Sequence, residues 1–271
     1  MNGLLTLDAR ELTCGPTAPD AFAYAFDGPG AGRAVVTFES QEHDRNLDLA
    51  LTLVSTLGTV LALYPDRGCW DDLTVRDDVD PGRTHGVGEN RLHVDLVDRD
   101  RMPRLIALYC MRADPAGGGA SALSDLHAAA GDLEEANLNL LRRPVFSYFT
   151  DHGVNGVGEG LARFAVLPEH LDSSEPIRFT SKMLPHLQRG ELVDGRAPEQ
   201  VAAAFGRLVA AAEARRTTVR LQPGQLLIFD QWRYAHGRMP LGPGQSDLPP
   251  GQRRLLKQAY GHRPAPMGGA R

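Results

Sequence analysis

The sequence predicts a mainly β fold, in which a core of antiparallel strands is covered by a few helices. Short apolar or β-branched runs recur between turn residues, whereas only three segments have helical periodicity. These helices and strands do not alternate along the chain as a doubly wound parallel sheet would require. No internal repeat or linker-like block divides the 271 residues, so we expect a single domain spanning residues 1–271.

Three segments have the pattern of a helix. In residues 41–56 apolar side chains recur on one helical face, and Gly58 ends the pattern. Residues 132–143 open with Asp132 as the expected N-cap of a capping box and stop before a proline. Residues 198–216 begin with a proline at the first helical position and close with two arginines, whose charge suits a helix C-terminus.

Five runs are predicted to be strands. Residues 105–111 are continuously apolar, which is typical of a strand that is buried on both faces. The other four runs are rich in β-branched and aromatic residues or alternate in polarity, and they span residues 144–150, 162–167, 217–221 and 226–229.

Composition and charge exclude several classes of protein. The 34 acidic residues outnumber the 29 Lys and Arg residues, which argues against a nucleic-acid partner or an anionic membrane surface. Cys14, Cys69 and Cys110 are too few and too scattered for a disulfide framework or a thiolate metal site. The N-terminus lacks a signal-peptide pattern, and the most apolar stretch, residues 47–64, is too polar to cross a membrane. We therefore expect a soluble, cytoplasmic globular protein with no nucleic-acid or membrane partner.

A His-x-Asp pair, His93 and Asp95, is the first candidate metal site. Residues i and i+2 of a strand point to the same face, so the imidazole and the carboxylate can grip one divalent cation. A third ligand would complete the 2-His-1-carboxylate triad that leaves one face of Fe(II) open. His236 follows an apolar strand that would carry it into the core. A second His-x-Asp, at residues 170–172, leads only into a polar loop and is the weaker candidate.

Five features then occur in a characteristic order. They are a helix that ends in Leu57-Gly58, the His-x-Asp pair, a Gly-Gly-x-Ser loop at residues 118–121, an L-x-F-D-x-x-R-x-x-H-G-R segment at residues 227–238, and an arginine six residues before Tyr260. From about Leu47 to Tyr260 the chain resembles the Fe(II)/2-oxoglutarate-dependent oxygenases of the taurine dioxygenase and clavaminate synthase-like family. The resemblance implies a double-stranded β-helix (jelly-roll) core with the iron between its sheets.

The resemblance also implies roles for individual residues. His93, Asp95 and His236 match the metal ligands of the family, and Arg254 matches the arginine that binds the distal carboxylate of 2-oxoglutarate. A guanidinium suits this task, because it is planar, always charged and able to donate two parallel hydrogen bonds to a carboxylate.

Two further residues have a possible role at the co-substrate. Ser121 occupies the place of a hydroxyl residue that helps to hold 2-oxoglutarate in the family, although it could equally be an ordinary loop serine. Arg238 lies two residues after His236 and could contact a carboxylate of co-substrate or product, or pair with an acidic neighbour.

The chain departs from the family in two places. The separation of His236 and Arg254 is longer than usual, because a loop rich in Gly and Pro lies between them, but the spacing to Tyr260 favours Arg254 over Arg253. Members that act on free amino acids often carry a substrate-binding arginine four residues after the co-substrate arginine. That position is Gln258 here, and Arg253 is the candidate replacement for substrate binding.

The expected function is that of a dioxygenase that uses Fe(II), 2-oxoglutarate and O2. It would hydroxylate an unactivated C–H bond of a free amino acid or related small polar metabolite, as in natural-product biosynthesis. The carboxylate at Asp95 favours hydroxylation over halogenation, since related halogenases carry Gly or Ala there. Desaturation, cyclisation or epoxidation by the same iron chemistry remains an alternative, as does a non-catalytic metal-binding jelly-roll protein.

Overall fold

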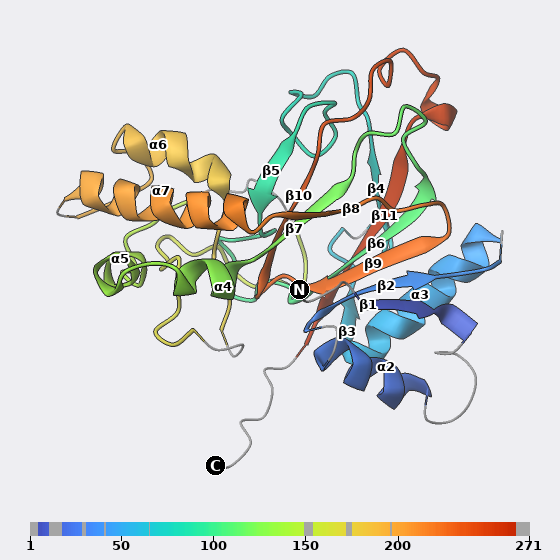
Figure 1. The fold of residues 1–271 in the computed structure, drawn as a ribbon, viewed down its shortest axis with the longest axis horizontal. Helices are drawn as coiled ribbons and strands as arrows, with labels where there is room; N and C mark the ends of the chain where they lie inside the picture. Colours follow the sequence, from blue (N-terminus) through green and yellow to red (C-terminus); the bar gives the residue numbers. More distant parts are fainter. Residues whose placement is uncertain are drawn as a thin grey trace.

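Two β-sheets form the centre of the molecule, with helices on either side (Figure 1). The computed structural model describes residues 5–10, 18–28, 31–40, 42–64, 66–148, 154–171, 175–195 and 197–263, so Cys14 lies outside the described residues. In the larger sheet the strand order is β1 (Leu5–Asp8), β2 (Arg33–Thr37), β9 (Gln225–Asp230), β6 (Leu105–Arg112), β11 (Leu255–His262) and β3 (Thr59–Leu61), with β4 (Asp71–Thr74) paired to β11. The smaller sheet has the order β5 (Asn90–His93), β10 (Tyr234–Arg238), β7 (Ser121–Asp125) and β8 (Thr217–Val219).

Strand β6 confirms the prediction of a strand buried on both faces. Its odd-numbered residues Leu105, Ala107 and Tyr109 pack in the apolar cluster beneath α2 and α3, and its even-numbered residues pack in a second cluster. That second cluster also contains Leu123 of β7 and Tyr234 of β10, so it lies between the two sheets. All strand pairs except the parallel pair β1–β2 are antiparallel, as expected for the predicted fold class.

The helices form two groups on opposite sides of the sheets (Figure 1). Helices α2 (Ala18–Asp27) and α3 (His43–Leu57) cover the outer face of the larger sheet. The second group lies beyond the smaller sheet and comprises α4 (Leu126–Gly131), α5 (Glu135–Leu141), α6 (Leu184–Gln188) and α7 (Pro198–Ala214). Two single turns of 3-10 helix, η1 (Ser181–Met183) and η2 (Pro250–Gln252), complete the described elements.

Two predicted helices are confirmed as α3 and α7, and the third is displaced. The residue after α3 is Gly58, and a side chain does not fit there because a Cβ would lie 2.0 Å from the carbonyl oxygen of His262. Asp132 is not an N-cap: it is the C-cap residue of α4, and α5 begins at Glu135. The Asp132 carboxylate instead accepts hydrogen bonds of 2.7 and 2.6 Å from Arg215, so a tertiary ion pair replaces the predicted cap.

Two predicted strands, at residues 144–150 and 162–167, are not formed in the described residues, and residues 149–150 lie outside them. Within residues 144–148 and 162–167 only isolated bridges occur, between Phe146 and Phe164 and between Phe146 and Val193. The aromatic side chains of these runs pack against one another and against Phe205 of α7. Burial beneath the second helix group therefore accounts for their apolar character. The predicted strands at residues 217–221 and 226–229 correspond to β8 and β9.

In the part of the chain that the structure describes, no helix combines the length and the apolar character needed to cross a bilayer. The cytoplasmic location stays a prediction from the sequence.

Candidate active site

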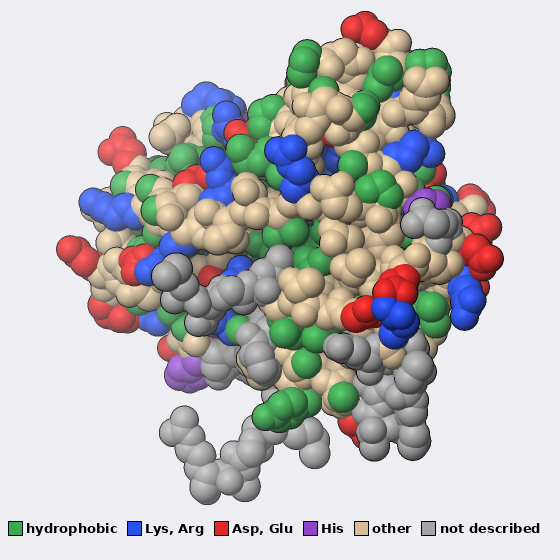
Figure 2. Space-filling view, turned by 45° about the vertical axis from the view of Figure 1, so that its right-hand side comes forward, with side chains coloured by type: hydrophobic (Ala, Val, Ile, Leu, Met, Phe, Trp, Pro, Cys, Tyr) green, Lys and Arg blue, Asp and Glu red, His purple; other side chains and the backbone are tan. Residues whose placement is uncertain are grey.

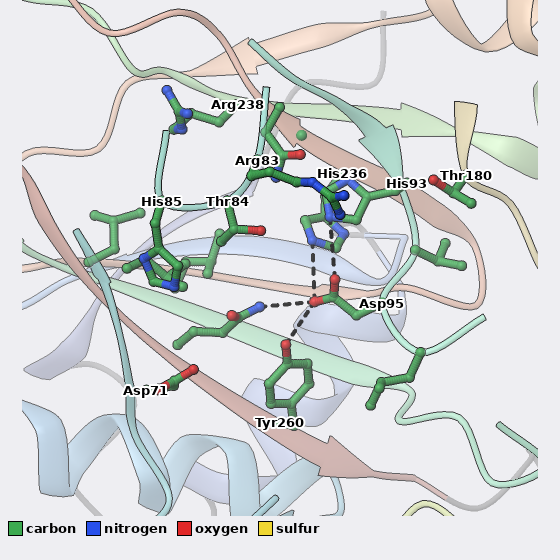
Figure 3. Close-up of a pocket in the computed structure, with 18 of the residues that line it drawn as sticks. Asp71, Arg83, Thr84, His85, His93, Asp95, Thr180, His236, Arg238 and Tyr260 are labelled. Carbon is green, nitrogen blue, oxygen red and sulfur yellow. Dashed lines mark hydrogen bonds and ion pairs between the residues drawn. The ribbon is translucent and has the colours of Figure 1, made fainter. Parts of the chain in front are cut away.

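Neighbouring strands of the smaller sheet bring the two histidines together. His93 at the end of β5 and His236 in β10 are register partners, and their ring centroids lie 4.3 Å apart. Asp95 follows in the turn after β5, with Oδ1 3.3 Å from His93 Nε2 and Oδ2 3.5 Å from His236 Nε2 (Figure 3). One ligand atom from each of the three residues lies within 4.8 Å of the others, which fits a single metal ion.

The protonation of His93 and Asp95 also suits a metal ion. His93 Nδ1 lies 2.7 Å from the Arg91 carbonyl, which can only accept, so Nδ1 carries the proton and Nε2 presents its lone pair to the site. Burial, and then the neighbouring His236, lower the pKa of His93. Burial would raise the pKa of Asp95, but the charges and hydrogen bonds of the imidazoles outweigh it and hold that pKa well below its usual range. Neutral imidazole and ionised carboxylate are the forms that bind metal.

Side chains around Asp95 fix its orientation. Tyr260 Oη and Gln258 Nε2 of β11 donate to Asp95 Oδ2 at 2.8 and 3.1 Å. The backbone N–H of Asp95 donates to Gln231 Oε1 at 2.8 Å, and Gln231 Nε2 donates to the Pro103 carbonyl at 2.6 Å. The roles of Gln258 and Gln231 were not predicted, since nothing in the sequence near either glutamine connects it to Asp95.

Arg254 lies beside the triad, in a cavity of about 490 Å³ that all four side chains line. It is only 8% exposed, and within the described residues its guanidinium makes no hydrogen bond or ion pair. Burial, followed by repulsion from Arg238, lowers the pKa of Arg254 to about 10. A buried guanidinium without a partner is a site for an anion, because an anion would offset the cost of its desolvation.

Backbone contacts set the position of Arg254. Its N–H donates to Gln245 Oε1 at 3.0 Å, and Gln245 Nε2 donates to Asp114 Oδ1 at 3.1 Å. Gly119 has φ +67°, and a Cβ on it would lie 3.0 Å from Cδ and Nε of Arg254. The glycine-rich loop therefore packs directly against the side chain of this arginine.

Ser121 and Arg238 both line the cavity, as register partners on β7 and β10. Ser121 also borders a smaller cavity of about 180 Å³, which Arg254 lines as well. Arg238 Nη2 donates to the Gly86 carbonyl at 2.6 Å and Nη1 to the Met239 carbonyl at 3.2 Å. Arg238 thus holds the loop before β5, and among the described residues it forms no ion pair with a carboxylate.

The expectation that Arg253 binds substrate is not supported by its position. Arg253 does not line the cavity. Its guanidinium donates to the carbonyls of Leu248, Val75 and Ser246 and pairs with Asp77. Successive residues of an extended segment point to opposite sides, so Arg254 faces the cavity and Arg253 ties down the loop that precedes it.

His170, the histidine of the competing His-x-Asp, does not line the cavity. His170 is exposed, and Asp172 lies outside the described residues.

Comparison with known proteins agrees with this geometry. The family model described as "Taurine catabolism dioxygenase TauD, TfdA family" matches residues 64–260, which include the triad, Ser121 and Arg254. The chain belongs to the TauD/TfdA dioxygenase family. A search of curated proteins found no match.

Solved structures of similar fold include other oxygenases. An asparagine oxygenase in complex with Fe(II), hydroxyasparagine and succinate has a TM-score of 0.72 and 20% identity, over 92% of this chain and 80% of that one. The non-haem iron oxygenase OrfP, in complex with Fe, succinate and hydroxyarginine, has a TM-score of 0.70 and 14% identity over 94% and 84%. PvcB, an oxygenase of an isonitrile pathway, has a TM-score of 0.52 and 17% identity over 89% and 80%. The predicted jelly-roll fold of this TauD/TfdA member is thus confirmed.

Proposed function

We propose that this protein is an Fe(II)/2-oxoglutarate-dependent dioxygenase that hydroxylates an unactivated C–H bond of an amino acid or a related small polar metabolite. One observation carries the proposal. The buried guanidinium of Arg254 has no partner among the described residues and faces the same cavity as a His-Asp-His triad. A purely structural metal site has no need of such a cation.

The donor set fits Fe(II). Two imidazoles and one carboxylate form the facial triad of non-haem iron oxygenases and leave coordination positions free. His236 Nδ1 is buried and has no hydrogen-bond partner among the described residues, while the ring packs against that of Phe229 with centroids 5.2 Å apart. A bound iron ion would supply the activation of O2, coupled to decarboxylation of 2-oxoglutarate to succinate.

The residues of the chain would bind and orient the reactants. Arg254 would hold the distal carboxylate of 2-oxoglutarate through two hydrogen bonds, with Ser121 as an additional donor at the same end. Tyr260 and Gln258 would keep the Asp95 carboxylate in its orientation during turnover. Arg238 would act chiefly by fixing the loop between β4 and β5, which lines the cavity.

The structural neighbours support an amino-acid type of substrate. The asparagine oxygenase and OrfP contain hydroxylated asparagine and hydroxylated arginine in their complexes. In the present chain Gln258 is engaged with Asp95, so a substrate carboxylate would need a donor elsewhere in the cavity.

The test is spectroscopic. Anaerobic addition of Fe(II) and 2-oxoglutarate should produce a weak visible absorption band in the wild type, and His236→Ala should abolish it. His170→Ala is the matched control, since it removes the histidine of the other His-x-Asp, and it should retain the band. A wild type without the band, or an undiminished band in His236→Ala, would overturn the proposal.

A further inference from the structure

The cavity around the triad holds more basic than acidic side chains, although the chain carries a net charge of −5. The basic side chains that line it are Arg67, Arg76, Arg83, Lys182, Arg238 and Arg254. The acidic ones are Asp71 and Asp95. Asp95 belongs to the triad, and Asp71 already accepts a 2.8 Å hydrogen bond from Arg67. On the face shown in Figure 2, acidic and basic side chains are interspersed.

Lys182, Arg83 and Arg76 are not explained by the proposed function, and of these Lys182 and Arg83 lie toward the triad. Arg254 and Arg238 lie at the co-substrate end of the cavity, where a dianion would bind. Within the described residues, neither Lys182 nor Arg83 makes a side-chain hydrogen bond or an ion pair. Lys182 is half-buried, and a partly desolvated ammonium is stabilised by an anion.

Two hydrogen bonds fix the segment that carries Lys182 beside the metal ligands. The Val94 N–H donates to the Phe179 carbonyl at 2.7 Å, and the Ser181 hydroxyl donates to the Leu92 carbonyl at 2.8 Å. These bonds lie on either side of His93, which itself forms an isolated bridge with Thr180. Burial lowers the pKa of Lys182. The negative charge of Asp95 raises this pKa and the positive charge of Arg83 lowers it, so the side chains of Lys182, Asp95 and Arg83 interact within one region of the cavity.

Arg83 reaches the cavity from a different element. It lies in the loop between β4 and β5, and Figure 3 shows its side chain pointing toward the imidazoles of the triad. The loop is internally bonded, with the Gly88 N–H donating to the Pro81 carbonyl at 2.8 Å. A Cβ on Gly86 would lie 2.3 Å from the Asp80 carbonyl oxygen, and Arg238 donates to the Gly86 carbonyl. Arg83 is therefore presented from a loop that is anchored to β10.

We propose that the substrate is an anion with more carboxylates than ammonium groups, and that Lys182 and Arg83 bind one of its carboxylates. This inference rests on the proposed oxygenase function and makes its substrate class more specific. A substrate ammonium would need an acidic partner, and in the described lining only Asp71 is available, already paired with Arg67. The asparagine and arginine frameworks of the neighbours' products carry no such excess of negative charge.

The experiment compares acids with their matched amides. L-Aspartate, L-glutamate and their N-acetyl derivatives are titrated anaerobically into the Fe(II)–2-oxoglutarate complex, alongside L-asparagine and L-glutamine. Binding is followed as a shift of the visible band. We expect at least one acid to bind roughly tenfold or more tightly than its amide, since hydrogen bonds to a charged group contribute about 1.5–3 kcal/mol.

The variants Lys182→Met and Arg83→Gln identify the residues responsible. Each should weaken binding of that acid roughly tenfold or more, while the affinity for 2-oxoglutarate stays as in the wild type. Arg91→Gln is the control for net charge, since Arg91 acts electrostatically on Lys182 but does not line the cavity. It should leave the preference for the acid intact.

Several results would overturn the inference. The inference fails if acid and amide bind equally, or if no acid shifts an intact band. It also fails if both variants keep the wild-type preference for the acid, or if Lys182→Met weakens 2-oxoglutarate binding as much as it weakens binding of the acid. Absence of the band itself in the wild type would instead refute the proposed function, so the two failures are distinguishable.

Discussion

Tyr260 and Gln258 donate to the same oxygen of Asp95, Oδ2, while Oδ1 lies 3.3 Å from His93 Nε2. Such outer contacts orient a ligating carboxylate and raise metal affinity. Burial, followed by the charge of Asp95, raises the pKa of the Tyr260 hydroxyl well above its usual range, so this hydroxyl stays a donor at physiological pH.

Tyr260→Phe should therefore weaken metal binding without altering the fold. We expect the affinity for Fe(II), or for Co(II) as a spectroscopic substitute, to fall about 10- to 100-fold, as is typical when such a contact is lost. Metal titration measures the effect, and the exposed Tyr24 offers Tyr24→Phe as the control. An unchanged affinity would show that the hydroxyl does not position Asp95.

The neighbouring arginines 253 and 254 should respond differently to the same substitution. Arg254→Lys keeps the charge but loses the two-pronged geometry, so the dissociation constant for 2-oxoglutarate should rise roughly tenfold or more. Arg253→Lys should leave that constant near the wild-type value and lower the thermal stability, because Arg253 binds backbone carbonyls and Asp77. Titration of the Fe(II)–2-oxoglutarate band separates the two, and equal effects would contradict these roles.

At the scale of elements, a glycine-rich loop and the loop before η2 together build the co-substrate end of the site. The Asp114 carboxylate accepts from the backbone N–H groups of Ala116, Gly118 and Gly242 at 2.9, 3.1 and 2.6 Å. It also accepts from Gln245, which holds the Arg254 N–H. One buried carboxylate thus links both loops to the arginine.

Gly119→Ala tests whether this packing matters. The new methyl group would lie 2.4 Å from Leu241 Cδ2 and 3.0 Å from Arg254, in a backbone conformation with φ +67° that favours glycine. We expect weaker 2-oxoglutarate binding together with a lower melting temperature. Gly131→Ala in α4 is the matched control, because a Cβ there has no atom within 4 Å. Identical 2-oxoglutarate affinities in the two variants would exclude a positioning role for the loop.

For the whole molecule, buried imidazoles predict how stability depends on pH. Burial lowers the pKa values of His85, His93 and His127 below their ordinary value near 6.5. As pH falls below about 6.5, the unfolded chain therefore binds more protons than the folded one, and the free energy of unfolding decreases. Above that pH these groups are neutral in both states and contribute no slope.

The melting temperature of the metal-free protein should accordingly be level between pH 7 and 8 and fall between pH 6.5 and 5. His127 lies outside the site, and its buried Nε2 has no hydrogen-bond partner among the described residues. His127→Gln should reduce the slope, whereas the same change at the exposed His170 should not. A melting temperature that rises as pH falls through this range would reverse the predicted sign.

The sequence by itself determined the features that depend on near neighbours. The His-x-Asp pair, the apolar run of residues 105–111 in β6 and the helices α3 and α7 follow from residue spacing. The ordered motifs indicated the family and the roles of His236 and Arg254. The tertiary structure alone decided which distant groups meet. It brought Gln258 and Gln231 into hydrogen bonds with Asp95. It placed Lys182 in the cavity, in the segment that bridges to His93, and kept Arg253 out of the cavity lining. It also packed Phe146 against a helix where a strand was predicted. The physical reason is that spacing fixes the face on which a side chain lies, whereas its partner there is fixed by strand register and by the packing of segments far apart in the chain.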